Sequence, residues 1–128
     1  VLMVSIFQHP FYPYSGTEKP AANMCNVPLA AGSGGEEFRD AVLQVWTPRL
    51  REFKPQMIFI SAGFDGHYED DMGGLKLVEK DYAWCTDHLK KLAAEMCEKR
   101  IVSMLEGGYV MTSLARSVGA HLRVLADL

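Results

Sequence analysis

Three side chains that could take part in metal-assisted chemistry follow two apolar runs. Asp65 and His67 come after MIFISAG (57–63), and Tyr109 comes after IVSMLE (101–106) and two glycines. Carboxylates and imidazoles are common zinc ligands. A phenol stays protonated at neutral pH and can donate a hydrogen bond to a developing oxyanion. These residue types therefore indicate a metal site beside an oxyanion donor.

Each of these residues also has a purely structural interpretation. Asp65 at the end of a strand is equally a helix cap or a loop acid. The run YEDDMGG (68–74) is typical of a solvated loop, and an Asp-x-His spacing is weak evidence on its own. Tyr109 could simply pack under the turn that Gly107 and Gly108 form. From spacing alone, these alternatives stay open.

Other kinds of site find little support. GSGG (32–35) lacks the Lys-Ser/Thr ending of a phosphate loop, and no GxSxG motif is present. The three cysteines show no CxxC spacing, which favours reduced thiols and a cytoplasmic location. A net charge of -3 gives no basic field for nucleic acid, and no apolar run is long enough for a membrane span. Histidines 9, 88 and 121 are expected in packing, surface or loop positions.

Hydrophobic periodicity predicts alternating strands and helices. We expect strands over 2–7, 26–30, 57–63 and 101–106, and helices over 35–53, 79–98 and 111–127, the first interrupted near Pro48. This order predicts an α/β fold, a parallel sheet with helices on both faces. The loops after the strands, which carry Asp65 and Tyr109, then share one edge of the sheet. So few strands leave an open sheet edge, which another segment or subunit must cover.

Several stretches together resemble one family. QHPFYPYSG, NVPLAAGSGG, FISAGFDGHYEDDMGGL, DYAW and IVSMLEGGY are similar, in this order, to the C-terminal part of zinc-dependent deacetylases of the histone deacetylase superfamily, in the bacterial, class II-like style. The resemblance covers nearly the whole chain. It implies part of the arginase/deacetylase fold, a three-layer α/β/α arrangement with a narrow tunnel leading to one zinc ion.

The resemblance also implies roles for particular residues. Asp65 would be a zinc ligand and Tyr109 the donor that stabilises the transition state, while Phe64, Gly107 and Gly108 would line the tunnel. Zinc would be the cofactor of the complete site, and the substrates would be amides of acetyl-lysine or acetylpolyamines. His67 remains a second candidate metal ligand, on the chemistry of its imidazole alone.

The chain departs from the family pattern in one major respect. The family's other two zinc ligands and its paired catalytic histidines lie in an N-terminal segment, and this chain has no His-His pair. It also starts inside an apolar strand pattern. We therefore expect residues 1–128 to be a single domain, the C-terminal part of a deacetylase-like domain whose N-terminal part is absent. The alternative is a catalytically inactive α/β module that acts through oligomerisation or interaction, with a homo-oligomer or an N-terminal segment covering the sheet edge.

Overall fold

The computed structural model describes the whole chain, residues 1–128. Its strands are β1 (Met3–Gln8), β2 (Met24–Leu29), β3 (Ile58–Ala62) and β4 (Ile101–Leu105). Its helices are α1 (Gly35–Ala41), the π-helical turn η1 (Val42–Trp46), α2 (Thr47–Phe53), α3 (Glu79–Met96) and α4 (Met111–Leu125). Every element expected from the sequence is present, with bounds shifted by one or two residues. None of the helices combines the length and apolarity needed to cross a membrane.

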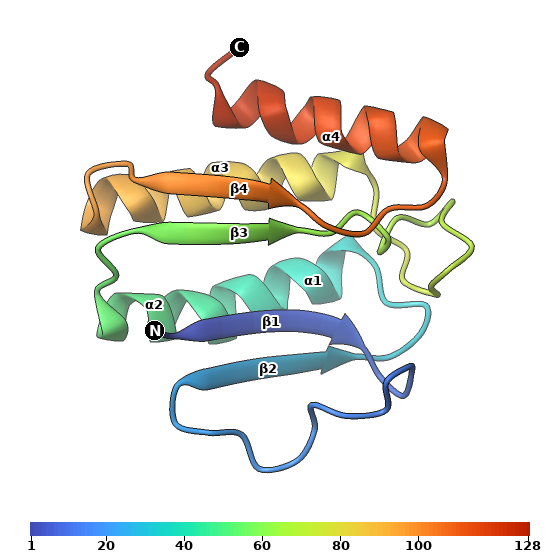
Figure 1. Cartoon of the computed structure of the whole chain (residues 1–128), viewed down its shortest axis with the longest axis horizontal. Coiled ribbons are helices and arrows are strands. Elements are labelled where there is room, and N and C mark those ends of the chain that lie inside the picture. Colours follow the sequence, from blue (N-terminus) through green and yellow to red (C-terminus); the bar gives the residue numbers. More distant parts are fainter.

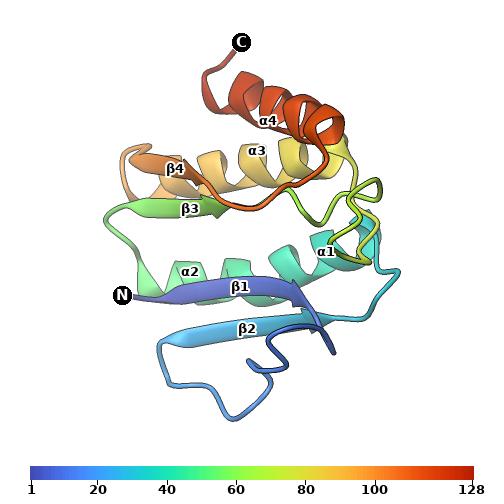
Figure 2. The ribbon, with the colours of Figure 1, turned by 45° about the vertical axis from the view of Figure 1, so that its right-hand side comes forward.

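The four strands run in one direction and form two hydrogen-bonded pairs. β1 pairs in parallel with β2, and β3 pairs in parallel with β4. Figures 1 and 2 place the strands in the spatial order β4, β3, β1, β2, so β3 and β1 are neighbours. No ladder of hydrogen bonds joins those two strands. Unpaired backbone edges therefore face each other in the middle of the row as well as at its ends.

Alternate residues of β3 and β4 divide between a covered side and an open side. Ile58 is buried against Ala93 of α3, whereas its neighbour Phe59 is 64% exposed and Met104 is 43% exposed. Figure 1 shows α1, α2 and α3 behind the strands, with α4 beyond β4. The parallel α/β class is confirmed, and within this chain the side of β3 and β4 opposite α3 stays open.

The core lies between the strands and the helices behind them. Val42 of η1 is fully buried, and Leu92 of α3 is 1% exposed. Burying an aliphatic side chain of this size stabilises a fold by about 1.5–3 kcal/mol. The largest cluster lies under the carboxyl ends of the strands and supports the loops there; it consists of Phe38, Val42, Ala62, Phe64, Leu77 and Tyr82.

The helical segment 35–53 is continuous, and its expected interruption takes the form of a π turn. η1 ends at Trp46, and Pro48 occupies the first turn of α2, where its missing N–H is tolerated. The hydroxyl of Thr47 donates to the carbonyl of Val42 at 2.8 Å, which satisfies an acceptor in the widened turn. The segment therefore stays helical along β1 instead of breaking at the proline.

Candidate active site at the carboxyl ends of the strands

The segments that follow β3 and β4 are tied together by main-chain hydrogen bonds. The N–H of Glu106 donates to the carbonyl of Ala62 at 3.0 Å, and the N–H of Phe64 donates to the carbonyl of Gly107 at 2.7 Å. Because β3 and β4 are parallel, the segments that follow these two strands leave the sheet at the same end (Figure 1). Asp65 and Tyr109 follow directly, so the pairing brings their loops together.

Asp65 carries a carboxylate that is poorly accommodated by the protein alone. The residue is exposed as a whole, but a Cβ added to Gly107 would lie only 2.6 Å from its Oδ2 atom. Partial desolvation raises the pKa of Asp65; its own backbone N–H opposes this, and the negative charge of Asp70 adds to it. A carboxylate destabilised in this way is stabilised by a bound cation.

The two glycines before Tyr109 exclude a side chain for different physical reasons. Gly107 leaves the space that the Asp65 carboxylate occupies. Gly108 has a φ of 140°, which side chains rarely adopt, and a Cβ there would meet Leu114 at 2.6 Å. Tyr109 itself is 57% exposed. The phenol therefore projects from a main chain that passes very close to its neighbours.

The main chain at Tyr109 is held by a residue that the sequence did not distinguish. Asp70 is 4% exposed, and its Oδ2 atom accepts the N–H of Tyr109 at 2.8 Å. Its Oδ1 atom accepts the N–H of Met72 at 2.9 Å. Asp70 stands between Glu69 and Asp71 in an acidic run, and nothing in residue type or spacing separates it from them. Only the fold reveals that this aspartate alone faces inward.

Asp65 and Tyr109 line one cavity of about 620 Å³. Phe64 does not line it, because its ring is 3% exposed and belongs to the core. Gly107 and Gly108 lie beside the lining residues and not among them. Loop 9–16 and the face of β1 supply most of the remaining wall, whose aromatic members are Phe7, Phe11 and Tyr12.

The side chain of His67 contacts other groups and does not point into the cavity that Asp65 lines. It is 1% exposed, and its Nδ1 atom accepts the N–H of Glu69 at 3.1 Å. Its Nε2 atom lies 3.5 Å from a carboxylate oxygen of Glu79. Arg116 of α4 binds both Glu69 and Glu79, and its hydrogen bond is the main cause that lowers the pKa of Glu79 to about 2. The Nδ1 atom of His67 thus serves the β3–α3 loop, whereas its buried Nε2 atom approaches Glu79 without a hydrogen bond. The ion pairs of Arg116 link this loop to α4.

His88, His121 and the glycine-rich stretch have structural partners. His121 is 5% exposed and hydrogen-bonds Thr86 and Ser103, while His88 stacks on Trp84. In GSGG, the N–H of Gly34 donates to the side chain of Glu37 at 2.8 Å. The expected packing roles of these two histidines are confirmed. No group of three or more His, Cys, Asp or Glu side chains comes together in a way that could hold a metal ion.

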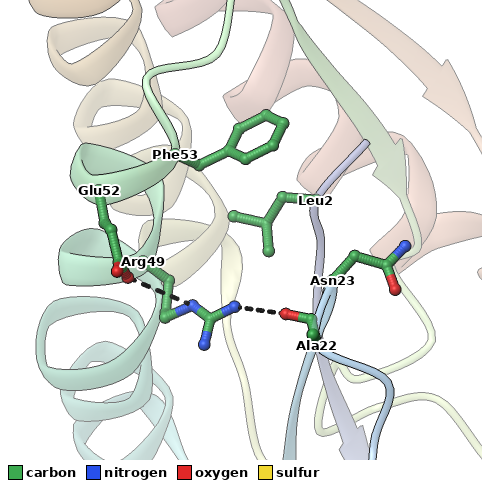
Figure 3. A pocket seen from close by; sticks show the side chains of 6 residues that line it. All are labelled: Leu2, Ala22, Asn23, Arg49, Glu52 and Phe53. Atoms are coloured by element: carbon green, nitrogen blue, oxygen red, sulfur yellow. Dashed lines mark hydrogen bonds and ion pairs between the residues drawn. The ribbon is translucent and has the colours of Figure 1, made fainter.

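A second cavity, of about 590 Å³, lies at the opposite ends of the strands (Figure 3). Its only cation, Arg49, donates to the carbonyl of Ala22 at 2.8 Å and lies 4.0 Å from Glu52. Leu2 and Phe53 supply the apolar part of its wall. Arg49 is therefore already hydrogen-bonded, and Glu52 is the single carboxylate in this wall.

Comparison with known proteins identifies the family of this chain. Residues 1–125 match the Histone deacetylase domain family. The chain is 44% identical over 108 residues to "Type-2 histone deacetylase 2" of Dictyostelium discoideum, covering 82% of this chain and 6% of that protein. It is 37% identical over 115 residues to a "Probable deacetylase" of Archaeoglobus fulgidus, covering 85% of this chain and 32% of that protein. The chain thus spans a third or less of each of these relatives.

A solved structure gives the same answer for the fold. The crystal structure of the HDA15 HD domain superposes with a TM-score of 0.87 at 30% sequence identity, covering 98% of this chain and 37% of that one. The four parallel strands, the helices behind them and the loops that carry Asp65 and Tyr109 are therefore part of a larger known architecture. This chain belongs to the histone deacetylase family.

Proposed function

We propose that this chain is the C-terminal part of a zinc-dependent deacetylase domain, which hydrolyses amides of acetyl-lysine or acetylpolyamines when the rest of the site is supplied from outside the chain. The observation that carries the proposal is that Asp65 and Tyr109, 44 positions apart by their numbers, line one cavity at the carboxyl ends of paired strands. The family match supports the reaction class.

Asp65 fits one position of a zinc site. Its carboxylate oxygens are suitable donors, and a cation would offset the desolvation that raises its pKa. A catalytic zinc usually takes three protein ligands, so the other two come from outside these residues. When bound, zinc polarises the substrate carbonyl and lowers the pKa of a coordinated water. We assign His67 to the loop network, because both of its nitrogens face other groups.

Tyr109 is the oxyanion donor in this proposal. As an acetamide is attacked, its carbonyl oxygen gains negative charge, and a fixed O–H donor lowers the barrier by stabilising that charge. The Tyr109 ring lines the cavity and is 57% exposed, so a substrate can approach it without displacing core residues. Asp65, through the metal that it would help to hold, and Tyr109 would therefore serve the same substrate carbonyl from two adjacent loops.

The wall of the cavity favours a neutral head group on an alkyl chain. Asp65 is the only charged residue that lines it, and much of the rest is aromatic or aliphatic. Such a wall suits the methylene chain of acetylated lysine or of an acetylpolyamine.

Zinc content and turnover together test the proposal. The chain is joined to a segment that supplies the remaining ligands, for example that of the Archaeoglobus relative, to give a complemented domain. We expect one zinc per chain by elemental analysis and acetate release from an acetyl-lysine peptide, both lost in Asp65→Asn. Asp40→Asn, at an exposed position, is the matched control. Zinc and turnover that survive Asp65→Asn would contradict the proposal.

A second candidate is an inactive module that works through association, and one observation favours it. The edges of β1 and β3 that face each other are unpaired, and Phe59 and Met104 are exposed on the open side. We propose that an additional segment, or another copy of the chain, covers these edges. Sedimentation of the isolated chain tests this candidate: an oligomer without turnover supports it, and a folded monomer contradicts it.

We also propose a cytoplasmic location. The three cysteines are free thiols, two of them buried, as is usual in a reducing compartment. Fractionation of cells that express the tagged protein tests this, and recovery with an exported fraction would contradict it.

A further inference from the structure

The side chain of Tyr109 has little packing to hold it in position. Its ring is 57% exposed, and the two residues before it have no side chains. Packing therefore fixes little of the phenol's location, and the main chain must do most of that work. The side-chain acceptor of the Tyr109 N–H is Asp70, at 2.8 Å.

Asp70 is placed to join the two loops of the site. Its N–H donates to the carbonyl of His67, and its Oδ1 atom accepts the N–H of Met72, which fixes it within the β3–α3 loop. Its Oδ2 atom reaches across to the loop after β4. At 4% exposure the carboxylate is shielded from water, where hydrogen bonds to an ionised acceptor are stronger than in solution.

We propose that Asp70 is the positioning residue for Tyr109, holding its main chain so that the phenol stays where a substrate carbonyl would be bound. The idea rests on the proposed function for its catalytic consequence, but its structural content stands on the hydrogen bond alone. Asp70 does not line the cavity and acts through Tyr109. Its bond to Met72 stabilises the local loop, and its bond to Tyr109 is the one that matters for catalysis.

The structural content is tested first, without activity. Amide hydrogen exchange of the unmodified protein should show the Tyr109 N–H protected, although its side chain is exposed. An unprotected amide would overturn the proposal, whatever the variants do. In protein labelled with 3-fluorotyrosine, the Tyr109 resonance, assigned by its loss in Tyr109→Phe, should shift or broaden in Asp70→Asn. An unchanged Tyr109 resonance in folded Asp70→Asn would overturn the proposal as well.

The catalytic consequence is tested in the complemented domain. Asp70→Asn keeps the side-chain volume and one acceptor, and we expect kcat to fall about 10- to 100-fold with KM within about twofold, because the donor is misplaced while the cavity remains. Asp71→Asn, at the exposed neighbouring position, should leave the Tyr109 resonance and kcat unchanged. A wild-type kcat in folded Asp70→Asn would overturn the positioning role. If the complemented domain proves inactive, the proposed function fails, and exchange and fluorine spectra still decide whether Asp70 positions Tyr109.

Discussion

Two cavities at opposite ends of the strands differ little in size and greatly in how their polar groups are satisfied. The cavity at the carboxyl ends of the strands has about 620 Å³ and the one at the amino ends about 590 Å³. At the amino ends, Arg49 is hydrogen-bonded to Ala22 and lies near Glu52. At the carboxyl ends, Asp65 is desolvated and its pKa is raised. Cavity volume is therefore a poor guide to function here, and an ionisable group with a shifted pKa is a better one.

The difference follows from the architecture. In parallel sheets, the chain leaves every strand at the same edge, so loops distant in sequence meet there. At that edge, Gly107 leaves room for a carboxylate and Asp70 holds the Tyr109 main chain. At the other ends, where chain segments enter the strands, Arg49 of α2 already donates to the carbonyl of Ala22. Variants at the two ends of the strands test this difference: equal effects at both ends would contradict it, and effects at one end would support it.

The largest expected effect comes from Tyr109→Phe in the complemented domain. Removing one oxyanion donor usually costs about 100- to 1000-fold in kcat, and we expect a loss of that size with little change in KM or zinc content. Tyr14→Phe, an exposed tyrosine outside the cavity wall, is the matched control. Steady-state kinetics with an acetyl-lysine peptide measure both. Equal rates for the two variants would mean that Tyr109 is a packing residue after all.

An intermediate effect is expected from a single methyl group. Gly107→Ala adds a Cβ that would lie only 2.6 Å from Oδ2 of Asp65. The carboxylate must then move, and kcat/KM should fall about 10- to 100-fold. Gly119→Ala in α4 meets nothing within 4 Å and should stabilise the helix by about 0.5–1 kcal/mol without affecting turnover. Kinetics and thermal unfolding of both variants give the comparison. Full activity in Gly107→Ala would show that the Asp65 carboxylate can shift without loss of function.

Sequence reasoning was most successful where periodicity is strong. Apolar runs at 57–63 and 101–106 predicted β3 and β4, and the strand ends then predicted one shared edge for Asp65 and Tyr109, which line one cavity in the structure. It was less informative where a π turn replaces a break at Pro48, because the outcome depends on how Thr47 satisfies the Val42 carbonyl. It also cannot foresee which strands pair, so the unpaired edges between β1 and β3 became visible only in the fold.

Side-chain direction inside loops was the other limit. Asp65 and His67 are the candidate ligands in the sequence, and Asp70 lies in the same loop, yet of the three only Asp65 lines the cavity. His67 turns toward Glu69 and Glu79, and Asp70 toward the Tyr109 amide. Loops have no fixed period, so their inward and outward positions depend on tertiary hydrogen bonds. Phe64 shows the same effect, because the family resemblance implies a tunnel position while its ring lies in the core.

The smallest expected effect is on the thermal stability of the metal-free protein. It tests most directly whether polar groups differ at the two ends of the strands. The pKa of Asp65 is raised in the folded chain, so folding favours its protonated form: this stability is fully present below the unfolded value and is lost as pH rises through the folded value. At pH 7 the ionised carboxylate thus weakens the fold. We expect Asp65→Asn to raise the thermal unfolding midpoint of the metal-free protein at pH 7, and the gain to vanish below the ordinary aspartate value of 3.8.

Arg49→Gln is the counterpart at the other cavity. It removes the donor to the Ala22 carbonyl, so the midpoint at pH 7 should fall or stay level, never rise. Opposite signs for the two variants in chelator-treated protein would show that polar groups are frustrated at one edge and satisfied at the other. If Asp65→Asn also lowers the midpoint at pH 7, the protein itself stabilises the Asp65 carboxylate, and no cation is needed to complete this end of the sheet.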